Sequence, residues 1–127
     1  MYRILLPLLA LALAGCGGEP PPLDMATTPE KSREVLVAAL DAWKAGATPK
    51  ELTARTPAVY LNDDSFARGV KLTDYKIEGE PKTFGTGLSY VLTLTLQDGA
   101  KPAAARKLAY RVVTRPNVSI SREDGIP

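Results

Sequence analysis

Polar and apolar positions in residues 28–55 predict two helices at the start of a folded domain. Apolar side chains recur at the spacing of one helix face, at Leu36, Ala39, Leu40 and Trp43. Thr27 or Thr28 suits the N-cap of this helix, because a proline follows and loses no hydrogen bond at the first helical position. A second cap signal at residues 48–51 predicts a short second helix that ends before Pro57.

The rest of the chain alternates apolar and polar residues, which is the period of a strand with one buried face. The pattern is clearest over residues 88–97, recurs over 107–112 and 118–121, and is weaker over 71–78. Asp98 and Gly99 suit a turn, so the two clearest strands are expected to pair as a hairpin. We therefore expect a curved antiparallel sheet of about four strands.

Together these elements predict an α+β fold. The N-terminal helix, with the short second helix, is expected to pack on one face of the sheet, because this buries both apolar stripes. We expect one domain over residues 28–127, long enough for a single modest core. Its core is expected to contain Leu36, Leu40, Trp43, Leu92, Leu94, Tyr110, Val112 and Ile120.

The composition excludes several kinds of active site. The 127 residues include no histidine and one cysteine, Cys16. The chain therefore has no Ser-His-Asp or Cys-His catalytic arrangement, no histidine-ligated metal site and no Cys-x-x-Cys motif. Its 16 Lys and Arg against 14 Asp and Glu lack the basic surplus of nucleic-acid binders. We expect a protein that is not an enzyme and that binds no nucleic acid, metal or cofactor.

Residues 1–15 have the layout of a signal peptide. Arg3 supplies a positive charge, an apolar run extends from Ile4 to Ala14, and small residues precede Cys16. The run is too short to cross a bilayer as a helix, which takes about 20 residues. We therefore expect export and cleavage rather than a permanent transmembrane helix.

The cleavage region carries a more specific pattern. Leu13, Ala14, Gly15 and Cys16 resemble the lipobox of bacterial lipoproteins. The resemblance implies that the Cys16 thiol receives a diacylglyceryl group and becomes the new N-terminus. Fatty acids such as palmitate would then hold the protein on a membrane, since two or three acyl chains anchor a protein stably. The alternative is an ordinary signal peptide that ends near a cysteine.

Residues 16–27 are expected to be the lipidated cysteine and a tether rich in glycine and proline. A docking peptide for a partner is the alternative interpretation of the prolines. Gly17 stands where an aspartate would favour retention at the inner membrane in many proteobacterial lipoproteins. We expect the protein at the outer membrane, facing the periplasm, or at the cell surface.

Three groups of charged residues have both a chemical and a structural interpretation. Residues 62–65 offer oxygen ligands of the kind calcium prefers, but a turn or a helix cap before Phe66 is simpler. Carboxylates that could form an acid–base pair, or a solvated strand edge, are Asp74, Glu78 and Glu80. Lys107, Arg111 and Arg115 are expected along one sheet face, with Arg106 and Arg122 near the ends, and these cations could contact lipid headgroups or an acidic polymer, or simply face solvent. We favour the structural interpretation of each group.

Aromatic residues raise the question of a ligand pocket. If the helix leaves part of the sheet uncovered, Trp43, Tyr60, Phe66 and Tyr90 would border a small apolar cleft. The alternative is that these rings belong to the core, where aromatic residues at the end of an amphipathic stripe usually lie.

Several short segments also carry a family resemblance, at residues 39–46, 63–69, 72–75, 110–114 and 118–120. They resemble small exported proteins of planctomycete-type bacteria with no assigned activity, which are similar to NTF2-like and cystatin-like α+β proteins. The resemblance supplies no catalytic residues. Larger NTF2-like enzymes place an Asp-His pair in the cone between helices and sheet, and this chain has no histidine.

Two hypotheses about function follow. The first is a lipid-anchored envelope protein whose domain is a non-enzymatic binding module for another protein or an envelope polymer. The second is a small-molecule-binding, or weakly catalytic, NTF2-like pocket protein.

Overall fold

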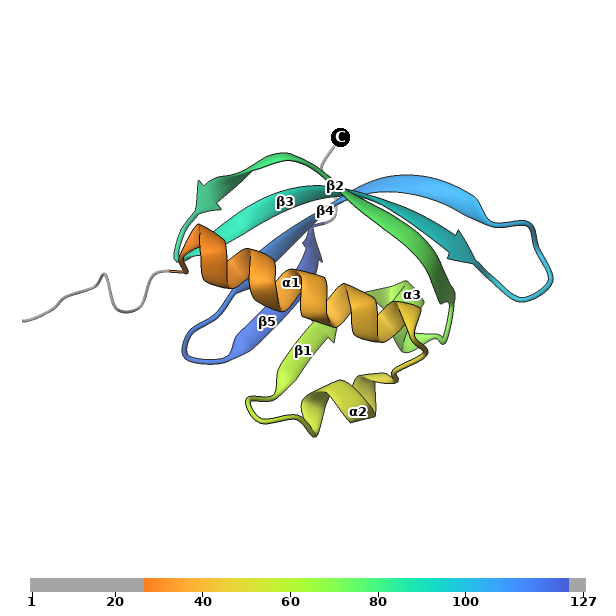
Figure 1. Cartoon of the computed structure of the whole chain (residues 1–127), viewed down its shortest axis with the longest axis horizontal. Coiled ribbons are helices and arrows are strands. Elements are labelled where there is room, and N and C mark those ends of the chain that lie inside the picture. Colours follow the sequence, from red (N-terminus) through yellow and green to blue (C-terminus); the bar gives the residue numbers. More distant parts are fainter. Residues whose placement is uncertain (1–26, 124–127) are drawn as a thin grey trace, which may run out of the picture.

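A computed structural model describes residues 27–123 of the chain. The helices are α1 (Pro29–Lys44), α2 (Pro49–Thr53) and α3 (Asp64–Ala67). The strands are β1 (Val59–Asn62), β2 (Lys71–Phe84), β3 (Gly87–Gln97), β4 (Ala104–Val113) and β5 (Val118–Glu123). Figure 1 shows α1 lying across one face of a curved sheet, which confirms the predicted α+β class with an N-terminal helix.

The sheet has five strands in the order β1-β5-β4-β3-β2. Strand β1 runs parallel to β5, with Leu61 opposite Ile120, and the other neighbours are antiparallel. The prediction of about four antiparallel strands is therefore wrong in two respects, because residues 59–62 add a strand and make the sheet mixed. Strand β2 also continues past the predicted residue 78 to Phe84, after a register shift between Glu78 and Lys82.

Side-chain caps start the first two helices where the sequence places them. Thr28 is the N-cap of α1, and its Oγ1 accepts a hydrogen bond of 3.2 Å from Lys31 N. Thr48 and Glu51 form a full capping box at α2. These bonds satisfy backbone donors that the first helical turn cannot pair internally, so they fix where each helix begins.

The core lies between the helices and one face of the sheet, which we call the inner face. All eight residues predicted for the core are buried there: Leu36, Leu40, Trp43, Leu92, Leu94, Tyr110, Val112 and Ile120. Leu52 of α2 and Phe66 of α3 join the same cluster. The prediction of a single core is confirmed for the described residues.

The opposite face of the sheet, which we call the outer face, carries the polar half of each alternating strand. Residues directly opposite one another in neighbouring strands share a face, so Ser89, Arg111 and Ser121 form one row across it. Large apolar side chains that remain exposed in residues 27–123 are Tyr60, Phe84 and Val91. Their register places all three on the outer face.

The predicted signal peptide of residues 1–15 and Cys16, the predicted site of lipidation, lie outside the described residues, as does most of the expected tether. Within residues 27–123, no helix is long and apolar enough to span a membrane.

Candidate functional site

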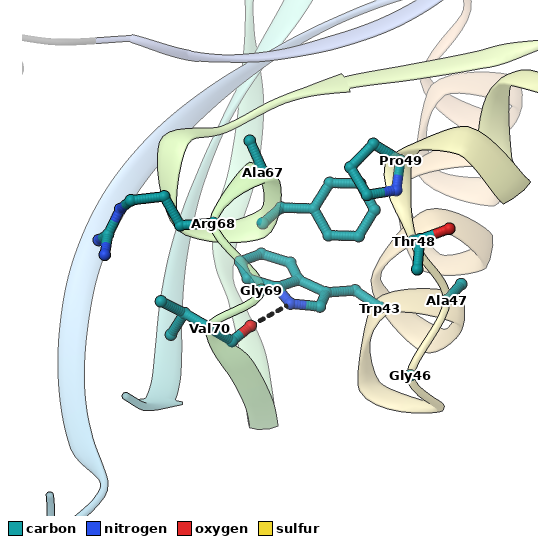
Figure 2. A pocket seen from close by; sticks show the side chains of 10 residues that line it. Trp43, Gly46, Ala47, Thr48, Pro49, Ala67, Arg68, Gly69 and Val70 are labelled. Atoms are coloured by element: carbon teal, nitrogen blue, oxygen red, sulfur yellow. Dashed lines mark hydrogen bonds between the residues drawn. The ribbon is translucent and has the colours of Figure 1, made fainter. Parts of the chain in front are cut away.

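A cleft of about 390 Å³ opens at the end of α1 (Figure 2). One wall is the turn between α1 and α2, at residues 46–49, and the other is formed by residues 66–70 from α3 toward β2. Trp43 lies between the two walls. We call this feature the Trp43 cleft.

Trp43 is fixed by packing and by one hydrogen bond. It lies on the buried stripe of α1 and is 3% exposed. Its Nε1 donates a hydrogen bond of 2.8 Å to the backbone oxygen of Val70, drawn as the dashed line in Figure 2. A buried indole N–H needs such a partner, and this one ties the last turn of α1 to the residue before β2.

Phe66 packs against Trp43 from the short helix α3. The two ring centroids are 5.3 Å apart and the planes are inclined by 60°, a tilted arrangement that aromatic pairs favour. Helix α3 begins at this point because Asp63 is its N-cap, with Oδ1 accepting a hydrogen bond of 3.1 Å from Phe66 N. The helix cap that was favoured over a calcium site for residues 62–65 is therefore confirmed.

A buried polar cluster of Asp63, Tyr110 and Arg122 holds α3 against the sheet. The Tyr110 hydroxyl donates to Asp63 Oδ2, and Arg122 Nη1 lies 3.8 Å from the same oxygen. Burial, and then the Asp63 carboxylate, raise the pKa of Tyr110 well above its usual value. Tyr110 therefore remains a neutral donor, and the cluster positions Phe66 through the cap.

The polar side chains of the Trp43 cleft already have partners within the protein. Arg68 Nε donates a hydrogen bond of 2.9 Å to Asp64 Oδ2, which raises the pKa of Arg68. Figure 2 shows the Arg68 guanidinium pointing away from Trp43. Thr48 Oγ1 accepts a hydrogen bond of 3.2 Å from Glu51 N in the capping box of α2.

The Trp43 cleft is therefore better suited to binding a partner than to catalysis, because its polar side chains are already hydrogen-bonded within the protein. The two aromatic rings form a closed floor, since each is almost fully buried. Small residues of the walls, Pro49, Ala67 and Gly69, are exposed. A cleft of this kind fits a small apolar group, such as an aliphatic side chain of a partner.

The four aromatic residues predicted to border a cleft do not lie together. Trp43 and Phe66 meet at the Trp43 cleft. Tyr90 lies under the start of α1, where its hydroxyl is 2.5 Å from Ser32 Oγ and donates to Pro29 O over 3.3 Å. Tyr60 is 44% exposed on the outer face.

The outer face has a second hollow, of about 600 Å³, that the sequence did not predict. Phe84 lies at its side with the Arg111 guanidinium 3.8 Å from the ring centroid. Arg111 Nη2 is 3.2 Å from Glu123 Oε2, and Ser89 Oγ donates a hydrogen bond of 2.5 Å to Glu123 Oε1. The one sequence feature that could have pointed to Phe84 is its position just before the turn at Gly85. The prediction ended this strand at residue 78, so Phe84 was not recognised as an outward-facing residue of β2.

The predicted cations are divided between the two faces of the sheet. Lys107 and Arg111 alternate onto the outer face, whereas Arg106 and Arg122 are on the inner face. Lys107 and Arg111 therefore share a face, as predicted, and Arg106 and Arg122 do not join them. No group of three or more potential metal ligands occurs in the part of the chain that the structure describes.

Comparison of the chain with protein-family models, with curated proteins and with solved structures finds no match. The family resemblance therefore stays a prediction.

Proposed function

We propose that this protein is a lipid-anchored protein of the bacterial cell envelope, held to its membrane through Cys16. The observation that supports this proposal is the pattern of Leu13, Ala14, Gly15 and Cys16 behind a short apolar run. Cys16 is the only cysteine of the chain and stands at the position that a lipobox requires. Acylation would also remove a free thiol that oxidation threatens in an exported protein.

In this proposal the domain is a non-enzymatic binding module for an envelope protein or polymer. The Trp43 cleft supports a binding role, because Pro49, Ala67 and Gly69 are small exposed wall residues without polar side chains. The cleft lies at the end of α1, and a helix of 16 residues is about 24 Å long. It is therefore remote from Thr27, through which the anchored segment reaches the domain, and would be open to a partner.

Metabolic labelling with an alkyne fatty acid tests the anchor. The wild-type protein should be labelled and should stay with the membranes, and Cys16→Ala should lose the label. Labelling that persists in Cys16→Ala, or a wild type that is never labelled, would contradict the proposal.

Photo-crosslinking in intact cells tests the binding module. A crosslinking amino acid at Ala67, an exposed wall residue of the Trp43 cleft, should capture a defined envelope component. The same amino acid at Ala38, which is exposed on α1, is the matched control. Equal products at both positions, or none at Ala67, would count against a partner at the cleft.

A small-molecule pocket of the NTF2-like kind is the second candidate function. The size of the Trp43 cleft favours it, since about 390 Å³ falls within the range of ligand sites. Native mass spectrometry of the protein extracted from its own cells should then show a bound small molecule. Ala67→Leu, which narrows the cleft, should abolish that species, whereas Ala38→Leu should keep it.

A further inference from the structure

Three segments meet where the chain enters the domain. Thr27 N donates a hydrogen bond of 3.0 Å to Thr86 O, in the turn between β2 and β3. Thr114 N, just before the turn between β4 and β5, donates a hydrogen bond of 3.1 Å to Thr27 Oγ1. Thr27 is itself buried, so its position is fixed at this end of the sheet. We call this part of the domain the Thr27 end.

The length of the preceding chain brings the Thr27 end close to the anchor. From Cys16 to Thr27 the chain can extend by at most about 40 Å, at ~3.6 Å per residue. Strand β3 leads from the Thr27 end to the opposite turn near Ala100, and its 11 residues cover about 34 Å. Figure 1 shows these two turns at opposite ends of the sheet. The turn near Ala100 could contact the membrane only if the chain between Cys16 and Thr27 ran back along the whole length of the domain.

The Thr27 end carries the side chains that a lipid surface would accommodate. Phe84 is 50% exposed and lies two residues before Thr86. Lys82, on the same face of β2, and Arg115, which follows Thr114, are both exposed. Apolar rings enter the headgroup region of a membrane, and each Lys or Arg near the surface is attracted to anionic lipid phosphates.

Arg111 positions the Phe84 ring for contact with lipid. Its guanidinium lies 3.8 Å from the centroid of the Phe84 ring and so covers one side of the ring. The charge of Arg111 is balanced by Glu123, whose side chain is 10% exposed. Arg111 thereby holds the Phe84 ring in place and leaves part of the ring exposed. The Glu123 carboxylate, which would otherwise repel lipid phosphates, is paired with Arg111.

We propose that the Thr27 end of the domain rests on the lipid surface, with Phe84 among the headgroups and Lys82 and Arg115 against lipid phosphates. The proposal rests on the proposed lipidation of Cys16. It assigns an orientation to the anchored domain, with the Trp43 cleft directed away from the membrane.

Depth-dependent fluorescence quenching tests this orientation on the full-length lipoprotein. The protein is reconstituted in vesicles of phosphatidylethanolamine and phosphatidylglycerol that contain lipids with a quencher near the headgroup. Thr86→Cys places a dye at the Thr27 end, and Ala100→Cys places it in the exposed turn at the other end of β3. Each introduced cysteine is the only free thiol, because Cys16 is the sole native cysteine and its sulfur is alkylated in the lipoprotein.

The dye at position 86 should be quenched several-fold more strongly than the dye at position 100. Phe84→Ser, and separately Lys82→Gln with Arg115→Gln, should lower the quenching at position 86 toward that at position 100. Phe84 is half exposed, and an unchanged Trp43 emission spectrum would show that the variants remain folded. Equal quenching at the two positions, or quenching at position 86 that the Phe84 and cation variants leave unchanged, would overturn the proposal.

If Cys16 is not lipidated, the experiment gives a different result. A protein without the diacylglyceryl group would not join the vesicles at all, and its purified form would lack the added mass. That result would contradict the proposed function, and the orientation with it. A protein that is lipidated and bound to vesicles but shows no difference between the two positions would contradict the orientation alone.

Discussion

The most informative single substitution is Asp63→Ala, because it removes a buried carboxylate that serves three partners. The carboxylate caps α3 through Phe66 N at 3.1 Å, accepts from the Tyr110 hydroxyl and lies 3.8 Å from Arg122 Nη1. Alanine offers no acceptor, so the substitution leaves the Tyr110 hydroxyl buried without Asp63 and removes that carboxylate from beside Arg122. Breaking a buried charge pair by deleting one partner costs about 3–5 kcal/mol.

This cost is large for a domain of this size. The lost cap, about 1 kcal/mol, is part of the same network and is not simply additive. Small domains are stable by about 5–15 kcal/mol, and each kcal/mol shifts the melting temperature by about 4–8 °C. We therefore expect Asp63→Ala to lose about 3–4 kcal/mol and to melt roughly 15 °C below the wild type.

Urea unfolding followed by the fluorescence of Trp43 measures the effect, since Trp43 is the only tryptophan and is buried. Asp64→Ala is the matched control, because the neighbouring carboxylate pairs with Arg68 in solvent and should matter much less. Asp63→Asn, which keeps an acceptor for the cap and for Tyr110, should fall between the two. Equal losses for Asp63→Ala and Asp64→Ala would refute the structural role of the buried cluster.

Two further predictions concern Trp43 and the tyrosines. Trp43→Phe should cost about 1–2 kcal/mol in urea unfolding followed by circular dichroism, because it removes the 2.8 Å bond to Val70 O and leaves that carbonyl without its donor; unchanged stability would contradict this role. Burial raises the pKa of Tyr110 above its usual range and that of Tyr75 to about 12. The folded state thus keeps protons that the unfolded state releases above about pH 10, so the melting temperature should fall as the pH rises above that value. The fall should be smaller in Tyr110→Phe, and a decline of equal steepness would argue against the raised pKa.

The sequence predicted the inner half of the fold well because burial leaves a periodic trace. In β3 every second residue from Leu88 to Leu96 is buried, and the alternation was visible over the whole strand. The stripe of α1 had the helical period, and its N-cap at Thr28 was a local signal. Such patterns can be recognised without knowing which other helix or strand packs against them, because the sequence of each element shows which of its sides is buried.

The parts that the sequence did not predict depend on distant partners. Strand β1 has four residues, and its pairing with β5 joins segments almost 60 residues apart, from Val59 opposite Val118 to Asn62 opposite Ser121. The extension of β2 passes through a register shift with Gly79 at a φ of 64° and then Pro81, both of which normally interrupt a strand. Pairing with β3 overrides these local signals.

Of the four aromatic residues considered for a cleft, only Trp43 and Phe66 lie at it, again because contacts between distant segments decide the outcome. Trp43 and Phe66 meet because α3, which precedes β2 in the chain, lies against the last turn of α1. Tyr90 contacts Ser32, which lies 11 residues before Trp43 on α1 and so about 16 Å away. Tyr60 belongs to the outer face through its pairing with Ser119. The sequence identified these four rings as candidates, but register and strand order decided which of them share a site.

The central claim, attachment through Cys16, is tested most directly by mass spectrometry of the N-terminal peptide of the mature protein. We predict a peptide that begins at Cys16 and carries a diacylglyceryl group on its sulfur, with the signal residues removed. A mature protein that begins elsewhere, or one in which Cys16 keeps a free thiol, would contradict the account.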